Sequence, residues 1–318
     1  MQKTNCPLCK KDDTEVVSTI SDRNVASTNV LCKGCGLVYT NPRMDEQERQ
    51  TYYQGLFAQE RHDTATLEKA IARIEQKGTM KKFEESARYL LTFVKGEKKI
   101  LEIGCSYGCF LKNLEMLGAR VQGVEPSLSE FECATRHFGL SVVNSTAEQF
   151  LASGNQDTYN AIIMHHVLEH VGDPVGVLTQ LLNRLEKDGV IYLAVPDICH
   201  THEPLDVFFQ IPHLIYFSLH TLNETVKKAG GKIIAQSKKL PKLGLHVIVA
   251  RHDDTRSAVP DEMLSSGNLP EKIKRALRVQ GAIYNTLRTA NKLANRWLNN
   301  DTKKKLQDFA KKLLNKFR

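Results

Sequence analysis

A glycine-containing turn that follows a short apolar strand constrains the fold of this 318-residue chain more than any other feature. The strand candidate is 100–103, and it leads through Gly104 and Gly108 into a helical pattern over 110–117. Further strand candidates lie at 121–124, 161–164, 190–195, 232–234 and 246–249, with helical patterns between most of them. This alternation predicts an α/β fold with a parallel sheet wound by helices on both faces, and ligands bound at the carboxyl ends of its strands.

The sequence of this turn limits the classes of ligand that it can bind. It has the form Glu102-x-Gly104-x-x-x-Gly108, which is neither the GxGxxG of a pyrophosphate-binding turn nor a P-loop ending in Gly-Lys-Ser/Thr. A second acidic residue, Glu125, closes the next strand, where a carboxylate can accept hydrogen bonds from both hydroxyls of a ribose. The two features together predict a nucleoside-containing cofactor.

Three segments, 101–108, 123–127 and 159–171, resemble the motifs of class I S-adenosylmethionine-dependent methyltransferases, the last resembling the ubiquinone-methylase-like branch. The resemblance covers about residues 98–251 and implies a Rossmann-like, doubly wound, seven-stranded sheet. It also implies a set of cofactor-binding residues. These are Glu102, Gly104, Cys105, Tyr107, Gly108, Glu125, Pro126, Ala147, Glu148 and His165.

Four of the eight cysteines form two C-x2-C pairs near the start of the chain, Cys6 with Cys9 and Cys32 with Cys35. Two such turns at the ends of a short hairpin can place four thiolates around one Zn²⁺ ion. Because sulfur would fill all four coordination positions, the pattern predicts a structural zinc ribbon rather than a catalytic zinc site.

Histidines after the predicted strands are the candidate bases, because an imidazole titrates near neutral pH. His166, which follows the strand candidate 161–164, is one such candidate. Enzymes that methylate a nucleobase amine commonly carry an Asn/Asp-Pro-Pro-Tyr loop at this place. This chain has no such loop there, which disfavours that acceptor. The segment 211–222 resembles one in zinc-ribbon-bearing deoxysugar C-methyltransferases, which implies that His213 is the base and Tyr216 a positioning aromatic. Pro212 replaces the Glu of that motif, and we expect no counterpart of the large carboxyl-terminal domain of those enzymes.

The net charge of +8 is concentrated at the end of the chain. Residues 269–318 carry fourteen Lys and Arg and three Asp and Glu, a net charge of +11, so the remaining residues carry −3. Within this region, apolar residues recur at helical spacing over 306–317 beside a lysine-rich face. Such a helix can bind an anionic membrane surface, pack against the enzyme or a second subunit, or contact RNA, and the sequence leaves these alternatives open.

No apolar stretch reaches membrane-spanning length, and the first residues lack a signal-peptide core. These features predict a cytoplasmic protein. Peripheral contact with the inner membrane face is a further option. We expect a methyltransferase that acts on a sugar or related precursor of a cell-surface glycan or glycolipid. The alternatives are a ribosomal RNA methyltransferase and a non-enzymatic zinc-ribbon protein. The expected units are a zinc ribbon (1–43), a helical cap or linker (44–95), a cofactor-binding domain (96–251), a linker (252–268) and a basic helical tail (269–318).

Overall fold

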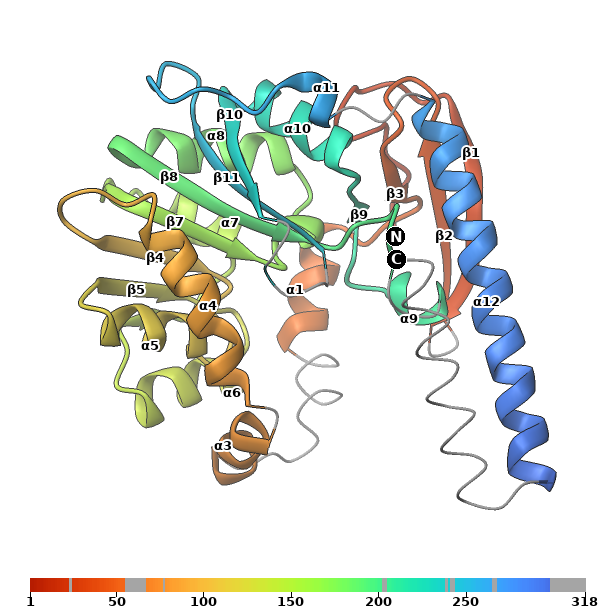
Figure 1. Cartoon of the computed structure of the whole chain (residues 1–318), viewed down its shortest axis with the longest axis horizontal. Helices are drawn as coiled ribbons and strands as arrows, with labels where there is room; N and C mark the ends of the chain where they lie inside the picture. The colour runs from red at the N-terminus through yellow and green to blue at the C-terminus, as the bar shows by residue number, and fades with distance from the viewer. Residues whose placement is uncertain are drawn as a thin grey trace.

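The computed structural model describes residues 1–22, 25–54, 67–76, 78–201, 205–237, 240, 244–264 and 268–297. Within these residues the strands form a seven-stranded sheet and a smaller four-stranded sheet (Figure 1). The larger sheet has the order β10-β11-β8-β7-β4-β5-β6. Its strands are β4 (Lys99–Ile103), β5 (Arg120–Val124), β6 (Val142–Val143), β7 (Tyr159–His165), β8 (Leu185–Val195), β10 (Gly231–Ser237) and β11 (Leu245–Arg251).

The prediction of a parallel sheet is correct for β4 to β8 and wrong at one edge. Strand β11 runs antiparallel to both of its neighbours, β8 and β10. Only a short connection joins β10 to β11, and a parallel pair would need a crossover of a dozen or more residues. The seventh strand, β6, has two residues, too few to give the periodic pattern by which the other six were recognised.

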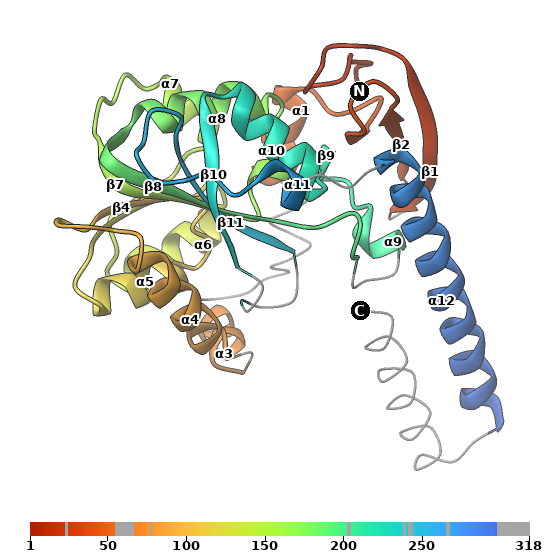
Figure 2. The same cartoon turned by 45° about the horizontal axis from the view of Figure 1, so that its top comes forward.

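Helices cover both faces of this sheet, as predicted (Figure 2). One layer contains α4 (Thr79–Leu91) and α5 (Cys109–Met116), whose buried residues pack against Ile100, Ile163 and Tyr192. The opposite layer contains α7 (Ala147–Ala152), α8 (Pro174–Asn183) and α10 (Leu219–Lys228), which pack against Leu101 and Ile162. Neighbouring strand residues thus face opposite layers, as the pleat requires. Helix α4, which the sequence placed in a cap or linker, is part of this core.

Successive strands are added to the sheet in one direction from β4 and in the opposite direction from β7. From β4 the chain adds β5 and β6 on one side, and it then returns to add β7 and β8 on the other side. The connections leaving β4 and β7 therefore diverge, which opens a crevice at the carboxyl ends of these two strands. The short elements α6 (Leu128–Glu132), η1 (Cys133–His137) and η2 (Leu168–His170) lie in the connections that follow β5 and β7.

The smaller sheet contains the cysteine-bearing segment and one strand from a distant part of the chain. Its strands β1 (Thr14–Asp22), β2 (Val25–Cys32) and β3 (Val38–Thr40) are consecutive, and β9 (Ile215–Tyr216) completes it. Strand β9 pairs antiparallel with β3, with Val38 opposite Tyr216. The predicted ribbon of residues 1–43 is therefore completed by a strand that local sequence patterns could not assign to it.

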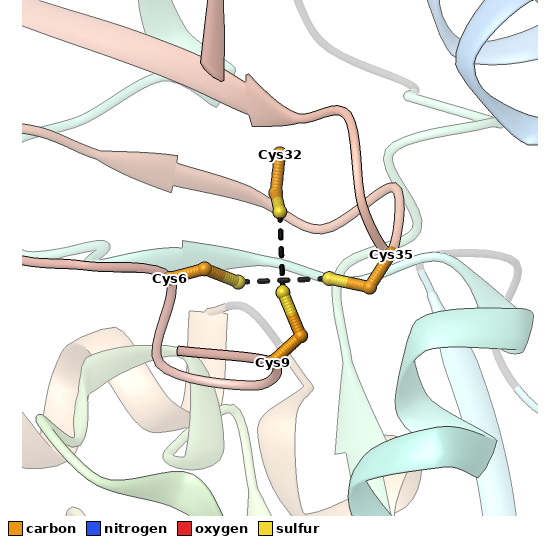
Figure 3. A group of neighbouring side chains, drawn as sticks. All are labelled: Cys6, Cys9, Cys32 and Cys35. Carbon is orange, nitrogen blue, oxygen red and sulfur yellow. Dashed lines mark hydrogen bonds between the residues drawn. The ribbon is translucent and has the colours of Figure 1, made fainter. Parts of the chain in front are cut away.

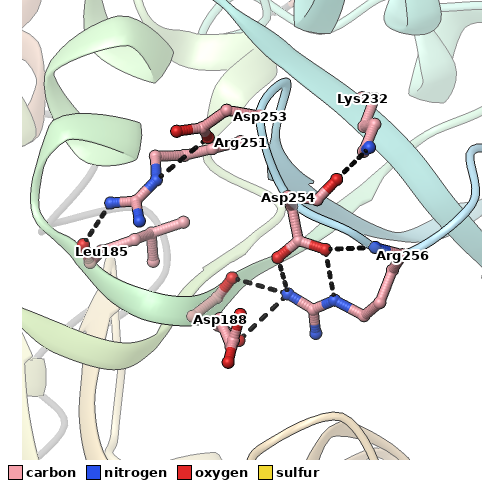
Figure 4. Close-up of polar contacts among 8 residues, drawn as sticks. Leu185, Asp188, Lys232, Arg251, Asp253, Asp254 and Arg256 are labelled. Atoms are coloured by element: carbon pink, nitrogen blue, oxygen red, sulfur yellow. Dashed lines mark hydrogen bonds and ion pairs between the residues drawn. The ribbon is translucent and has the colours of Figure 1, made fainter.

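The start of the predicted linker is bound to the sheet (Figure 4). Lys232 Nζ on β10 donates to the carbonyl oxygen of Asp254 at 2.6 Å, and Arg256 Nη2 donates to the carbonyl oxygen of Asp188 at 3.0 Å. The hydrogen bond from Arg256 also lowers the pKa of the Asp254 carboxyl group. Further along, α11 (Asp261–Leu264) buries Leu264 in the core. The described part of 252–268 is thus a packed connection.

The basic tail begins as one long helix, α12 (Leu269–Trp297), which lies along the outside of the small sheet (Figures 1 and 2). Leu269, Ile273 and Leu277 are buried in a cluster that also contains Leu31 of β2 and Tyr216 of β9. The first turns of the tail therefore pack against the small sheet. The predicted alternatives of membrane binding, packing or RNA contact concern a later stripe and are not tested by this packing. The apolar stripe of 306–317 lies outside the described residues. Among the residues that are described, no helix is long and apolar enough to cross a membrane.

Replacing Ile273 by Ala should lower the free energy of unfolding by about 2–4 kcal/mol, because Ile273 has no exposed surface and the smaller side chain leaves a cavity. Val279 on the same helix has 42 % of its surface exposed and is the matched control, since Val279→Ala removes little buried surface. Urea denaturation of both variants measures the difference. Equal stabilities of the two variants would contradict this packing.

Candidate active site

The glycine turn after β4 adopts a backbone conformation that favours glycine. Gly104 has a φ of +71°, and its N–H donates to the carbonyl oxygen of Val124 at 2.7 Å, which fastens the turn to β5. A Cβ atom at Gly104 would lie 2.4 Å from Cγ2 of Val167, so no side chain fits there without displacement. Gly108 also has a positive φ, but a Cβ there would meet Leu140 and Ala134. Gly104 is therefore required at the crevice, and Gly108 is required for packing behind it.

Glu125 stands at the end of β5, as expected, and its carboxylate is fixed by the backbone. Oε2 accepts a hydrogen bond from the Ser106 N–H and Oε1 accepts one from the Ser127 N–H, both at 2.8 Å. The neighbouring Glu102 is 2 % exposed, and burial together with the charge of Glu125 raises the pKa of its carboxyl well above the ordinary value. The two acids thus differ: Glu125 faces the crevice, and Glu102 is enclosed beneath the turn.

A cavity of about 390 Å³ lies at the carboxyl ends of β4, β5, β7 and β8. Six of the expected cofactor residues line it, namely Gly104, Glu125, Pro126, Ala147, Glu148 and His165. The other four, Glu102, Cys105, Tyr107 and Gly108, do not line it, and their contact with the cofactor stays a prediction. The Cys105 side chain packs with Leu111 and Leu140, and Tyr107 packs against Ile74 and Cys133. These four residues shape the turn from behind.

The three expected catalytic residues are brought to the same end of the sheet, but only two of them line the cavity. His166 and His213 are lining residues. Tyr216 is 1 % exposed and lies behind His213, with 5.9 Å between the two ring centroids, and its hydroxyl donates to the His213 carbonyl oxygen at 3.4 Å. Tyr216 therefore supports the His213 segment from within the protein, and its role as a positioning aromatic stays a prediction.

The structure adds a buried carboxylate, Glu169, that the sequence analysis did not single out. Glu169 Oε1 lies 3.3 Å from His166 Nδ1 and 4.0 Å from His170 Nε2. Burial alone would raise the pKa of this carboxyl, but the hydrogen bond from His166 and the nearby His170 and His213 lower it to about 2. The spacing His166-x-x-Glu169-His170 was the available signal. Among the described residues, the ligand atoms of Glu169, His170 and His213 also lie within 4.8 Å of one another, which is close enough to share a cation.

One wall of the cavity comes from the region predicted to be a cap or linker. Helix α1 (Glu46–Gln54) contributes Arg49, which is 9 % exposed. Arg49 Nη1 donates to Glu148 Oε1 at 3.1 Å and to the carbonyl oxygen of His170 at 2.9 Å. These bonds connect α1 to both the expected adenine side and the histidine side of the cavity. A single arginine in a polar helix gives no periodic signal, so the sequence alone did not identify it.

The four predicted metal ligands converge at one end of the small sheet (Figure 3). Sγ of Cys6 lies 3.5 Å from Sγ of Cys35, and Sγ of Cys9 lies 3.4 Å from Sγ of Cys32. All four sulfur atoms lie within 4.8 Å of one another. Around a tetrahedral zinc with Zn–S bonds of about 2.3 Å, sulfurs are about 3.8 Å apart, so this set fits such an ion. None of the four cysteines lines the cavity.

The fold and this site define a methyltransferase domain of the S-adenosylmethionine-dependent class. A family model described as a methyltransferase domain matches residues 65–236, which is more than half of the chain. The chain therefore belongs to this family, as the sequence motifs predicted.

Curated relatives match over a shorter region. The ubiquinone biosynthesis O-methyltransferase of Aliivibrio fischeri (strain MJ11) is 30 % identical over 102 residues, which is 30 % of this chain and 43 % of that protein. A mitochondrial enzyme of the same name from Schizosaccharomyces pombe is 34 % identical over 102 residues, 30 % of this chain and 37 % of that protein. These matches span less than half of the length of either relative.

Solved methyltransferase structures are similar at lower identity. An S-adenosylmethionine-dependent methyltransferase from Archaeoglobus fulgidus is 19 % identical with a TM-score of 0.44, covering 65 % of this chain and 92 % of that one. A plantazolicin methyltransferase solved with S-adenosylhomocysteine is 17 % identical with a TM-score of 0.47, covering 64 % and 95 %.

Proposed function

We propose that this chain transfers a methyl group from S-adenosylmethionine to a sugar or related precursor of a cell-surface glycan or glycolipid, with a histidine assisting removal of the acceptor's proton. The observation that carries the proposal is one cavity in which the residues expected to bind the cofactor meet a group of histidines.

The residues present fit the cofactor. The missing side chain at Gly104 keeps the backbone open to the cavity, and the Glu125 carboxylate is held at the end of β5 to accept ribose hydroxyls. Ala147 and Glu148, at the start of α7, would lie on the adenine side. When bound, S-adenosylmethionine supplies an electrophilic methyl group on a sulfonium, and the acidic lining of the cavity favours a cationic ligand.

The charge of the cavity favours an acceptor whose reacting part is uncharged. Among the lining residues that the structure describes, the one arginine is Arg49, and it is already paired with Glu148. The acidic lining residues are Glu46, Glu125, Glu130, Glu148, Glu169 and Asp197. A phosphate-rich strand such as RNA would be repelled by this excess of carboxylates. A sugar ring that presents hydroxyl groups meets no such penalty.

Replacing His213 by Ala should reduce methyl transfer by about a hundredfold or more, the effect expected for losing a histidine that orients the acceptor or takes its proton. His213 is 7 % exposed, lines the cavity and accepts a hydrogen bond from the Gln210 amide, with 3.2 Å between the two Nε2 atoms. Affinity for S-adenosylhomocysteine should remain unchanged, because His213 lies on the expected acceptor side. Turnover with labelled S-adenosylmethionine measures the first quantity and calorimetry the second. Full activity of the variant would remove His213 from the mechanism.

The acceptor class is tested by incubating the full chain with methyl-labelled S-adenosylmethionine and a panel of nucleotide sugars, membrane glycolipids and ribosomal RNA. We expect label in a sugar-containing acceptor. Label in RNA, with binding that weakens steeply as salt increases, would instead support the ribosomal RNA alternative. A chain that binds neither S-adenosylmethionine nor S-adenosylhomocysteine would be the non-enzymatic zinc-ribbon protein.

The four-cysteine site and the basic tail complete the proposal. A Zn²⁺ ion held by Cys6, Cys9, Cys32 and Cys35 would be structural, because four thiolates leave no position for water or substrate. We place the enzyme in the cytoplasm, where its basic tail would allow peripheral contact with the anionic inner face of the membrane and so with a lipid-linked acceptor.

A further inference from the structure

Another cavity-lining histidine, His200, was a candidate base only as one of the histidines that follow predicted strands, and it was not among the residues assigned a catalytic role. His200 follows β8 in the loop that begins with Pro196, and both His200 and Asp197 are lining residues. Nδ1 of His200 lies 2.7 Å from Oδ2 of Asp197. Among the cavity-lining histidines, this contact to a carboxylate is shorter than that of His166, at 3.3 Å, or His170, at 4.0 Å.

The loop holds the aspartate in place. Asp197 is 9 % exposed, and its Oδ1 accepts a hydrogen bond from the Cys199 N–H at 2.8 Å. The backbone at Asp197 forms a parallel bridge with Phe217, and the Ile198 N–H donates to the Phe217 carbonyl oxygen at 2.9 Å. Because Phe217 follows the segment that carries His213, this pairing joins the His200 loop to that segment.

The two histidines differ in what occupies their basic nitrogen. In His200 the Nδ1–H donates to Asp197, so Nε2 carries the lone pair that can accept a proton. In His213 the corresponding Nε2 already accepts a hydrogen bond from Gln210. The side chain of His200 is also 59 % exposed, whereas His213 is 7 % exposed, so a proton taken by His200 can pass on to solvent.

From this geometry we propose that His200, oriented by Asp197, is a catalytic base of this site, and that His213 positions the acceptor. As the new bond forms between the acceptor oxygen and the methyl carbon, the bond from that carbon to sulfur breaks and its electron pair stays on sulfur. The hydroxyl proton moves to Nε2 of His200. Asp197 stabilises the imidazolium, and the proton then leaves to solvent. This inference rests on the proposed methyl transfer to a hydroxyl-bearing acceptor.

The charges around His200 give the expected pH dependence. The hydrogen bond to Asp197 raises the pKa of His200 above its ordinary value, while burial and Lys272 on the neighbouring helix α12 oppose the increase. A base must be unprotonated to act, so kcat/KM should rise with pH through the pKa of His200. Removing the Asp197 charge should shift that rise to lower pH, because the imidazolium then loses its counter-charge.

The test compares His200→Gln, Asp197→Asn and His213→Ala with the wild type, between about pH 5 and pH 9. His252→Gln is the matched control, because His252 is exposed and does not line the cavity. The substrate is whichever member of the acceptor panel the wild type labels. We expect His200→Gln to lower kcat/KM by about a hundredfold or more while affinity for S-adenosylhomocysteine stays unchanged. The variant should also lose the rise of kcat/KM with pH, which is the acidic limb of the pH profile. His213→Ala should lose activity but keep the acidic limb.

A readout that does not depend on turnover accompanies the kinetics. The ¹⁵N shifts of the His200 ring should show a protonated Nδ1 in the neutral wild type, and Asp197→Asn should weaken that preference. Wild-type kcat/KM with a wild-type acidic limb in His200→Gln, or a neutral His200 protonated on Nε2, would overturn the inference alone. If the wild type labels no member of the panel, the proposed function fails and this inference falls with it.

Discussion

Replacing Gly104 by Arg is expected to abolish binding of S-adenosylmethionine and S-adenosylhomocysteine. Gly104 has a φ of +71°, lines the cavity, and leaves no room for a Cβ atom on the side of Val167. A long side chain at this position must enter the space that the cofactor would occupy, so affinity falls through steric exclusion. Isothermal calorimetry with S-adenosylhomocysteine measures the loss directly.

Gly118→Arg is the matched control for this variant. Gly118 also has a positive φ, of +82°, but it is exposed, and a Cβ atom there would meet nothing within 4 Å. Both substitutions place a non-glycine residue in the left-handed region, at a cost of about 1–2 kcal/mol. The control should therefore lose stability but keep cofactor affinity. Retained binding in a folded Gly104→Arg variant would contradict the position of the cofactor at this turn.

Loss of the proposed zinc is expected to abolish methyl transfer while cofactor binding remains. Thr40 of β3 joins the small sheet to the segment that carries His213. Its N–H donates to the Leu214 carbonyl oxygen at 3.0 Å, and its Oγ1 donates to the His213 carbonyl oxygen at 2.9 Å. A structural zinc contributes its binding energy to folding of the segment that holds it. Without the ion, we expect β3 to release β9 and the wall of the cavity that carries His213 to lose its position.

Cys9→Ser tests this expectation, with Cys133→Ala as the control, because Cys133 is a buried cysteine outside the four-sulfur group. Metal analysis should find zinc bound to the wild type and to the control but not to Cys9→Ser. Activity should follow the zinc content, and calorimetry should find similar S-adenosylhomocysteine affinity in all three proteins. A zinc-free variant with wild-type turnover would show that the ribbon does not support the active site.

Local patterns in the sequence were sufficient for much of the fold and for the cofactor side of the site. Strand and helix periodicity identified six of the seven strands of the main sheet, and the glycine turn with Glu125 placed the cofactor at its carboxyl edge. These signals are local, since they depend on residues that lie within one strand–turn–helix unit. The antiparallel direction of β11 was missed, because pairing direction depends on contacts between strands rather than on periodicity within one.

Residues that act through long-range contacts were the least predictable. The resemblance named Tyr216 as a positioning aromatic without locating it, and pairing of β9 with β3 places it in the core beneath His213. Arg49 stands in a polar helix that gives no periodic signal, and it became visible as a site residue only through its contact with Glu148. Glu169 lies within a recognised motif, but only its contact with His166 showed that its carboxylate belongs to the site.

Reading the sequence was enough to identify the chemical groups that are available: two pairs of thiols, a glycine turn followed by Glu125, and histidines after several strands. Which of these groups lie close together depends on the fold. It joined the cysteine ribbon to the His213 segment, and it brought His200 beside Asp197 on the wall of the same cavity. The physical reason is that spacing within the chain specifies local conformation, whereas proximity between distant segments depends on strand pairing and on burial of a shared core.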